Sequence, residues 1–287
     1  MEPNPVEMFQ VYPIHDRIDR ITDISGVHMY LVKGDAEAVL LDTGVGCGRL
    51  DAFVRALTDL PLKVFLTHGH IDHAMGAGAF EDVWLNPREK AVYEEHCATE
   101  FRLKYIHGST VSGGKPEAAD VTAEMLALPK PFGEFHALRP GDKFELGGIS
   151  LEIMEGEGHT PGCVTVLIPE LRTLLLGDAC NPFTYLFDTT CSTVADYREM
   201  LLRLKDAVDG RYDHVLLCHG PDGRGSVDLI DSVISVCDDI LRGETDDMPF
   251  QGFHGESVCI AKAMDFTTFS RVDGGTGNIV YDPAKIR

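Results

Sequence analysis

The 287-residue sequence predicts a mixed α+β fold in which short strands outnumber helices. Apolar runs rich in β-branched residues end close to a glycine, as at 63–66 and 215–218. Longer segments carry apolar residues at helical spacing, and 194–208 is the clearest of them. A Gly-Gly pair at 147–148 separates two apolar runs, which is typical of a β-hairpin. Together these observations favour a strand-rich body with a few amphipathic helices.

The individual elements follow from the same patterns. The expected strands, which begin with a β-meander over 10–42, are 27–32, 38–41, 63–66, 83–85, 143–146, 149–154, 163–168, 173–176, 215–218, 257–264 and 278–281. The expected helices are 48–60, 88–105, 121–128, 194–208 and 226–241. Ser226 is the expected N-cap of the last helix, because a serine side chain satisfies a free backbone N–H at that position.

Residues 88–131 interrupt the strand-rich pattern, so we interpret them as a helical cap inserted into the main domain. The aromatic residues in and beside it are Tyr93, Phe101, Tyr105, Phe132 and Phe135. They either line a substrate pocket or pack the insert onto the body, and the sequence leaves both open. We expect residues 1–244 to form the main domain and 245–287 a C-terminal extension packed on it.

The net charge of the chain limits the classes of partner that it can bind. Forty-six acidic against 25 basic residues give a formal charge of −21, which disfavours nucleic-acid binding because that affinity comes from Lys and Arg at phosphates. The N-terminus lacks a signal-peptide pattern, and no run approaches the roughly 18 apolar residues of a membrane helix. Eight cysteines without a CxxC pair favour reduced thiols. We expect a cytoplasmic protein that acts on a small molecule, with no nucleic-acid or membrane partner and with a homodimer left open.

Four metal-capable side chains follow the strand at 63–66 within six residues: His68, His70, Asp72 and His73. Loops at the carboxyl ends of strands are where open α/β sheets tend to place their sites. His68 and His70 are two residues apart, so they point to the same side of an extended segment. Asp72 and His73 lie on the turn that follows and can face a second point nearby. The stretch predicts a metal site.

The same event recurs along the chain: an apolar run ends, and a histidine or aspartate appears beside a glycine. It happens at His159, Asp178 and His219. A lone histidine at a strand end is more often structural, but with the first cluster these residues supply five imidazoles and two carboxylates. That set suffices for two divalent metals with positions left for water. Asp42 also ends a strand, where a carboxylate more commonly serves a turn.

In the order of these motifs the chain resembles the metallo-β-lactamase superfamily, the αβ/βα sandwich hydrolases. The resemblance covers roughly residues 10–240. Its motifs are Leu41-Asp42-Thr43-Gly44, Thr67-His68-Gly69-His70-Ile71-Asp72-His73, Gly158-His159-Thr160-Pro161-Gly162, Gly177-Asp178 and Cys218-His219-Gly220. It implies a four-layer αβ/βα sandwich, here with a helical insert and a short C-terminal extension.

The resemblance also implies a role for each motif residue. It assigns the first metal to His68, His70 and His159. It assigns the second metal to Asp72, His73 and His219, with Asp178 bridging both ions. Asp42 is similar to the family's acid that orients the ligand loop from outside the ligand set. Zinc is the first expectation for the two ions, and iron or manganese also suits the donor set.

The implied chemistry is hydrolysis by a metal-bridging hydroxide, with Asp72 helping to move the proton. Several members of the superfamily fit less well. True β-lactamases generally lack the bridging carboxylate, nucleases of this fold bring basic surfaces, and flavin-linked diiron proteins carry a Glu where His70 stands. What remains is cleavage of a carboxylic ester, lactone or thioester.

The segment after Asp178 bears on the substrate. No Lys or Arg stands between Arg172 and Arg198, and 181–187 is apolar and aromatic. This argues against an anionic glutathione thioester and favours a small neutral or hydrophobic substrate. Tyr185 is a candidate catalytic donor to the developing oxyanion, with packing as the alternative. Phosphodiesterase activity, and a non-hydrolytic diiron protein that handles O₂ or NO or acts as a sensor, stay open.

Overall fold

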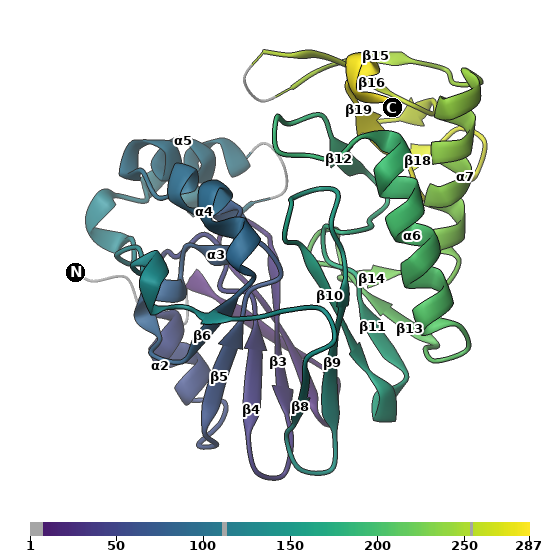
Figure 1. The fold of residues 1–287 in the computed structure, drawn as a ribbon. Coiled ribbons are helices and arrows are strands. Elements are labelled where there is room, and N and C mark those ends of the chain that lie inside the picture. The colour runs from purple at the N-terminus through teal and green to yellow at the C-terminus, as the bar shows by residue number, and fades with distance from the viewer. Residues whose placement is uncertain (1–7, 111–113, 253–254) are drawn as a thin grey trace. The chain divides into compact units, whose positions relative to one another are not determined.

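The computed structural model describes residues 8–110, 114–252 and 255–287 (Figure 1). The chain divides into two compact units. Unit 1 comprises Met1–Glu152 and Cys218–Gly223, and unit 2 comprises Ile153–Leu217 and Arg224–Arg287. The expected domain boundary after residue 244 stays a prediction.

Unit 1 contains a sheet whose seven described strands lie in chain order. They are β1 (Gln10–His15), β2 (Ile18–Thr22), β3 (His28–Lys33), β4 (Ala38–Leu41), β5 (Leu62–Phe65), β6 (Val83–Leu85) and β7 (His136–Ala137). β1 to β4 pair antiparallel, which confirms the predicted β-meander, whereas β4 to β7 pair parallel. Because β4 and β5 run parallel, the residues that follow them emerge at the same edge of the sheet.

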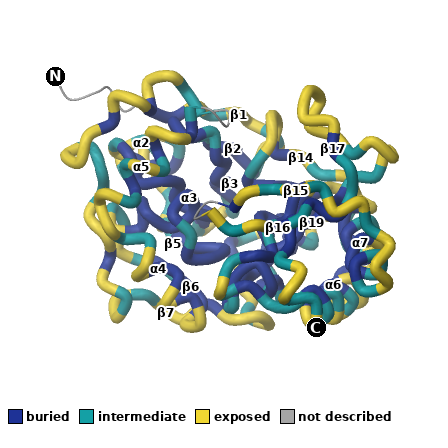
Figure 2. The backbone as a smooth tube through the Cα atoms, turned by 90° about the horizontal axis from the view of Figure 1, so that it is seen from above, coloured by how far each residue is buried: buried dark blue, intermediate teal, exposed yellow. Residues whose placement is uncertain are grey.

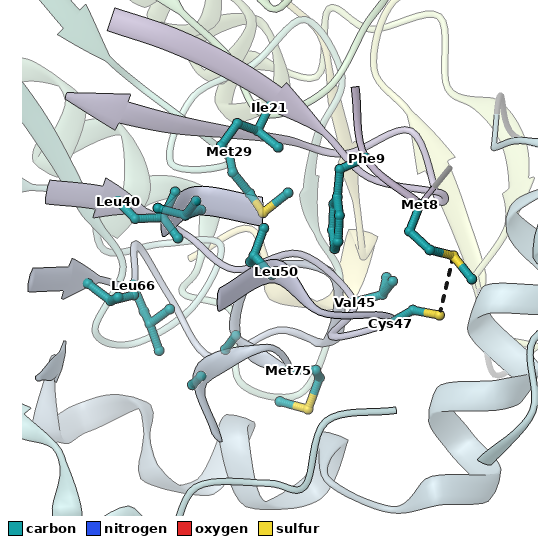
Figure 3. Packing of buried hydrophobic residues seen from close by; sticks show 14 of the residues in the cluster. Met8, Phe9, Ile21, Met29, Leu40, Val45, Cys47, Leu50, Leu66 and Met75 are labelled. Atoms are coloured by element: carbon teal, nitrogen blue, oxygen red, sulfur yellow. Dashed lines mark hydrogen bonds between the residues drawn. The ribbon is translucent and has the colours of Figure 1, made fainter. Parts of the chain in front are cut away.

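The core of unit 1 packs sheet residues against the flanking loops and α2 (Leu50–Arg55). Met29 and Leu40 from the sheet and Leu50 from α2 are all buried in it (Figure 3). Strand β3, which lies inside the sheet, is buried except at its last residue, Lys33 (Figure 2). α2 is shorter than the predicted helix 48–60, because its later apolar residues pack on the core from a turn.

The insert is helical only in part. The predicted helix 88–105 is split into a 3₁₀ turn, η2 (Pro87–Glu89), and two helices, α4 (Lys90–His96) and α5 (Thr99–Ser109). The break falls at Ala98, whose backbone is extended. The predicted helix 121–128 is wrong: within that fully described segment only Ala123–Met125 forms a 3₁₀ turn.

The segment around Met125 is extended because it pairs with another part of unit 1. The amide of Gly48 donates to the Met125 carbonyl at 2.9 Å, and the amide of Ala127 donates to the Gly46 carbonyl at 2.8 Å. A helix over the same residues would spend these backbone groups on itself. Tertiary pairing therefore overrides the local apolar spacing.

The predicted hairpin at the Gly-Gly pair is confirmed. β8 (Lys143–Glu145) pairs antiparallel with the first half of β9 (Ser150–Glu155). Gly147 and Gly148 both take positive φ, +86° and +73°, which a two-residue hairpin turn of this hand requires. The division between the two units falls inside β9.

Unit 2 begins with the second half of β9 and continues with β10 (Val164–Ile168), β11 (Thr173–Leu175), β13 (His214–Leu216) and β14 (Arg224–Gly225). Two helices pack against each other in this unit, α6 (Val194–Val208) and α7 (Leu229–Arg242) (Figure 1). α6 has the predicted bounds. α7 begins later than predicted, with Asp228 and not Ser226 at its N-cap, because the Ser226 carbonyl first closes a turn with the Leu229 amide.

A second sheet in unit 2 has the described strand order β12-β19-β16-β15. Its strands are β12 (Thr184–Leu186), β15 (Met248–Gln251), β16 (Ser257–Ile260) and β19 (Ile279–Tyr281). The predicted strand 257–264 divides into β16 and the start of a small hairpin, β17 (Met264–Asp265) with β18 (Ser270–Arg271). Residues beyond 244 are thus joined by hydrogen bonds to β12, whose strand the sequence did not reveal. Among the described helices, none combines the length and apolarity needed to cross a bilayer.

Candidate metal centre

The loop after β5 carries the densest group of candidate ligands. His68 and His73 are fully buried, and Asp72 is nearly so. Asp72 and His73, expected on a turn, lie in the short helix α3 (Ile71–Ala74), and His70 precedes it in extended conformation. The His68 ring centroid lies 4.7 Å from that of His70 and 4.1 Å from that of His73. The loop therefore gathers three imidazoles at one place.

Asp42 orients this loop. Its Oδ1 accepts a hydrogen bond from the Thr67 amide at 2.7 Å, and its Oδ2 accepts one from Thr67 Oγ1 at 2.8 Å. His73 Nδ1 lies 2.9 Å from the same Oδ2. Because a carboxylate only accepts, Nδ1 carries the hydrogen and Nε2 of His73 presents its lone pair. Asp42 takes a positive φ of +64°, a conformation that aspartate tolerates better than most residues.

His219 reaches the same place from the 218–223 segment of unit 1. Its Nε2 lies 3.6 Å from Asp72 Oδ2, and Asp72 Oδ1 lies 3.7 Å from His73 Nε2. One ligand atom from each of Asp72, His73 and His219 lies within 4.8 Å of the other two. One carboxylate oxygen and two imidazole nitrogens form a donor set that fits a divalent cation such as Zn²⁺.

His28 on β3 holds the 218–223 segment, a role that sequence reasoning missed. Its amide donates to the Cys218 carbonyl at 2.8 Å, and its Nε2 donates to the Gly220 carbonyl at 2.8 Å. Burial lowers the pKa of His28 to about 4, so its imidazole is neutral near pH 7. Its strand pattern alone contained no signal that this histidine would contact a distant loop.

Described residues of the insert contact the ligand loop and its helix. The amide of Gly69 donates to Glu89 Oε2 at 2.7 Å, and Glu89 is fully buried. The His96 ring centroid lies 5.0 Å from that of His70. Tyr105 Oη, on α5, donates to Asp72 Oδ2 at 2.7 Å. Sequence reasoning missed Glu89 and His96 and named Tyr105 only as one aromatic of the insert.

Unit 2 brings together the two remaining candidate ligands. His159 Nε2 lies 3.8 Å from Asp178 Oδ2, and both side chains are buried. His159 Nδ1 lies 2.9 Å from the Tyr185 carbonyl oxygen. Gly158, at φ +148°, allows the close approach of Tyr197 from α6, because a Cβ there would lie 2.3 Å from Tyr197 Cδ2.

Tyr185, the candidate oxyanion donor, lies in β12 with its ring in an aromatic cluster. Its centroid is 5.6 Å from that of Phe183, 5.3 Å from Phe187 and 6.4 Å from Phe250. Cys180 is fully buried, and burial raises the pKa of its thiol to about 12. Cys218 Sγ lies 3.6 Å from Asp42 Oδ2. The catalytic role of Tyr185 stays a prediction.

Comparison with known proteins relates these motifs to a family. The model of the Metallo-beta-lactamase superfamily matches residues 22–219. The acyl-coenzyme A thioesterase MBLAC2 of Gallus gallus is 27% identical over 202 residues, which are 67% of this chain and 72% of that protein. The probable metallo-hydrolase YybB of Bacillus subtilis is 30% identical over 154 residues, 53% of this chain and 61% of that protein.

Solved structures show the same fold. A metallo-beta-lactamase from Pontibacter korlensis is similar with a TM-score of 0.55 at 21% identity, covering 79% of this chain and 97% of that one. The sec-alkylsulfatase Pisa1 from Pseudomonas sp. is similar with a TM-score of 0.59 at 16% identity, covering 82% of this chain and 43% of that one. At such identities the likeness shows the fold alone, and it confirms the predicted fold class. With the family model matching most of its length, the chain belongs to the metallo-β-lactamase superfamily of metal-dependent hydrolases.

Proposed function

We propose that this protein is a two-metal hydrolase of acyl thioesters, with related esters and lactones as further substrates. The observation that carries the proposal is the donor set of Asp72, His73 and His219, in which Asp72 and His73 are buried and Asp42 orients His73. The thioester is favoured because 67% of the chain aligns with a relative named as an acyl-coenzyme A thioesterase. The acyl transfer itself adds a water oxygen to the carbonyl carbon and expels a thiol.

Seven side chains are the proposed metal ligands. His68, His70 and His159 would hold one ion, Asp72, His73 and His219 the other, and Asp178 would bridge them. The order of the motifs along the chain supports this assignment of His159 and Asp178. When bound, divalent ions lower the pKa of a coordinated water and polarise the carbonyl under attack. Zinc suits nitrogen and carboxylate donors best, and iron or manganese is compatible with them.

The chain's own residues prepare this site. Asp42 keeps the hydrogen of His73 on Nδ1, so the lone pair of Nε2 faces the donor set. The buried Glu89 carboxylate accepts from the Gly69 amide and so fixes the loop between His68 and His70. In the proposed reaction the Asp72 carboxylate takes the proton from the attacking water and passes it to the leaving sulfur.

We base the proposed apolar part of the substrate on an aromatic cluster in unit 2. Phe183, Tyr185, Phe187 and Phe250 form a contiguous aromatic cluster beside the carbonyl that contacts His159. No cationic side chain stands between Arg172 and Arg198 to attract an anionic acyl group. We therefore propose that the acyl part of the thioester is an aliphatic chain. Binding of this chain against an aromatic surface removes apolar area from water.

The test is a substrate panel on protein of measured metal content. Short-chain and long-chain acyl thioesters, lactones, oxygen esters and phosphodiesters are compared, before and after chelation. We expect metal-dependent cleavage of thioesters that His70→Ala and Asp178→Asn abolish, because each removes a proposed ligand. The control variants His214→Ala and Asp209→Asn change exposed residues of unit 2 and should keep full activity.

Three results would count against the proposal. Activity confined to phosphodiesters would reassign the substrate class. A redox-active iron pair without any hydrolysis would favour a diiron or sensor protein. Near-normal turnover in either ligand variant would refute the proposed metal centre.

A further inference from the structure

Within the described part of the 88–131 insert, Tyr105 contacts Asp72, a candidate ligand of the second metal. We propose that Tyr105 is a positioning residue that holds the Asp72 carboxylate in the orientation needed to bind metal together with His73 and His219. This inference rests on the proposed two-metal centre. It does not depend on which bond the enzyme cleaves.

The geometry at Asp72 explains why the carboxylate needs such a contact. Its Oδ1 lies 3.7 Å from His73 Nε2, and its Oδ2 lies 3.6 Å from His219 Nε2. Rotation about the Cβ–Cγ bond of an aspartate is soft, so these separations alone do not hold the carboxylate plane. The Tyr105 hydroxyl donates to Oδ2 at 2.7 Å, an ordinary length for an O–H···O hydrogen bond. It selects one orientation of the two oxygens.

Tyr105 can do this because its helix is anchored one turn earlier. Arg102 lies three residues before Tyr105 on α5, so the two side chains emerge from neighbouring positions on one helix face. Arg102 is 1% exposed. Its guanidinium donates to the carbonyls of Val45, Gly46, Met75 and Ala127.

One of these carbonyls links α5 directly to the helix that carries Asp72. Met75 is the C-cap of α3, the helix that carries Asp72. Arg102 therefore fixes α5 to the end of α3, and Tyr105 contacts a residue inside it. The insert acts in this way as a second support for the ligand helix, beside the Asp42 network that holds His73.

A second tyrosine of the insert is a matched control. Tyr93 on α4 is buried, and its hydroxyl donates to the Lys130 carbonyl and accepts from the Lys130 amide. Tyr93→Phe also removes a hydroxyl from the insert, but this hydroxyl contacts the Lys130 backbone and not a candidate metal ligand. It should lower the melting temperature without changing metal binding.

The experiment measures Zn²⁺ binding by competition with a chelator in wild type, Tyr105→Phe and Tyr93→Phe, together with their melting temperatures. We expect Tyr105→Phe to weaken the second equivalent of Zn²⁺ by about 10-fold to 100-fold, the usual effect of losing a contact to a metal ligand. The first equivalent and the folded structure should be retained. The spectrum of the Co²⁺-substituted protein should change in Tyr105→Phe and stay unchanged in Tyr93→Phe.

Wild-type affinity for both equivalents in Tyr105→Phe would overturn the proposal, and so would equal weakening by Tyr93→Phe. A wild-type protein that binds a single ion would overturn it together with the two-metal centre. A protein that binds two ions, shows the Tyr105 effect and cleaves no thioester would overturn only the proposed substrate class.

Discussion

The two units hold their candidate ligands by different means. In unit 1 the supports are side chains: Asp42 contacts His73, and Tyr105 contacts Asp72. Each support can be removed by one substitution that leaves the backbone in place. Loss of one support in unit 1 should therefore weaken metal binding at the ligand it contacts and leave the rest of the unit folded.

In unit 2 the contacts around the candidate ligands end on main-chain carbonyls. His159 Nδ1 lies against the Tyr185 carbonyl, and Cys191 Sγ lies 3.1 Å from the carbonyl of His159. Tyr197 donates to the Ala179 carbonyl at 2.7 Å, just after Asp178. A carbonyl is present whatever the side chain, so substitution can remove the donors of these contacts but not their acceptors. The contact of His159 with the Tyr185 carbonyl should be lost only when the backbone of unit 2 is displaced.

Arg102→Leu should have the largest effect, because it removes the anchor on which the insert depends. Several buried carbonyls would lose a charged donor, and we expect about 3–5 kcal/mol less stability. Urea denaturation measures the loss. Arg172→Leu, which changes an exposed arginine paired with Asp213, is the control and should have little effect. Equal losses in the two variants would contradict the role of Arg102 as an anchor.

Gly158→Ala should displace the backbone of unit 2. The new Cβ would meet the Tyr197 ring, and φ +148° is strained for alanine, so we expect a loss of about 2–3 kcal/mol. Weaker binding of Zn²⁺ should accompany it, because His159 is the next residue. Gly210→Ala is the control: its φ is also positive, at +65°, but no atom lies within 4 Å of the added Cβ. It should cost less and leave metal binding unchanged, and equal effects would argue against close packing at Gly158.

The sequence predicted what depends on strand ends. Asp42 and the His68–His73 stretch meet because parallel strands deliver their carboxyl ends to one edge, which short apolar runs reveal. The bounds of α6 also followed from local spacing, since an amphipathic helix carries its own period. The sequence motifs therefore predicted that Asp42 and the His68–His73 stretch of unit 1 lie together.

The contacts made by Glu89 and Tyr105 could not be predicted, because they join segments that no local sequence pattern relates. Glu89 and Tyr105 contact residues 20 and 33 positions away, through an insert whose path the spacing did not determine. The wrong helix at 121–128 has the same origin, since pairing with 46–48 determines its conformation. Sequence periodicity reports which face is buried, and not which polar atom it meets.

Asp42→Asn tests the comparison most finely, because it changes one oxygen and spares the backbone. Asparagine tolerates the positive φ of this position. If the asparagine oxygen still accepts the hydrogen bond from the Thr67 amide, the asparagine NH₂ faces His73 Nδ1. An NH₂ group only donates, so Nδ1 must then be the acceptor. The hydrogen then moves to Nε2, which can no longer bind metal.

We expect Asp42→Asn to lower kcat/KM and the affinity for the second Zn²⁺ by about 10-fold to 100-fold, with the melting temperature little changed. Asp35→Asn, at an exposed aspartate paired with Arg17, is the control. Unchanged zinc affinity in Asp42→Asn would mean that His73 keeps its tautomer without the carboxylate. The side chains of unit 1 would then be no more decisive than the main chain of unit 2, and the contrast between the units would fail.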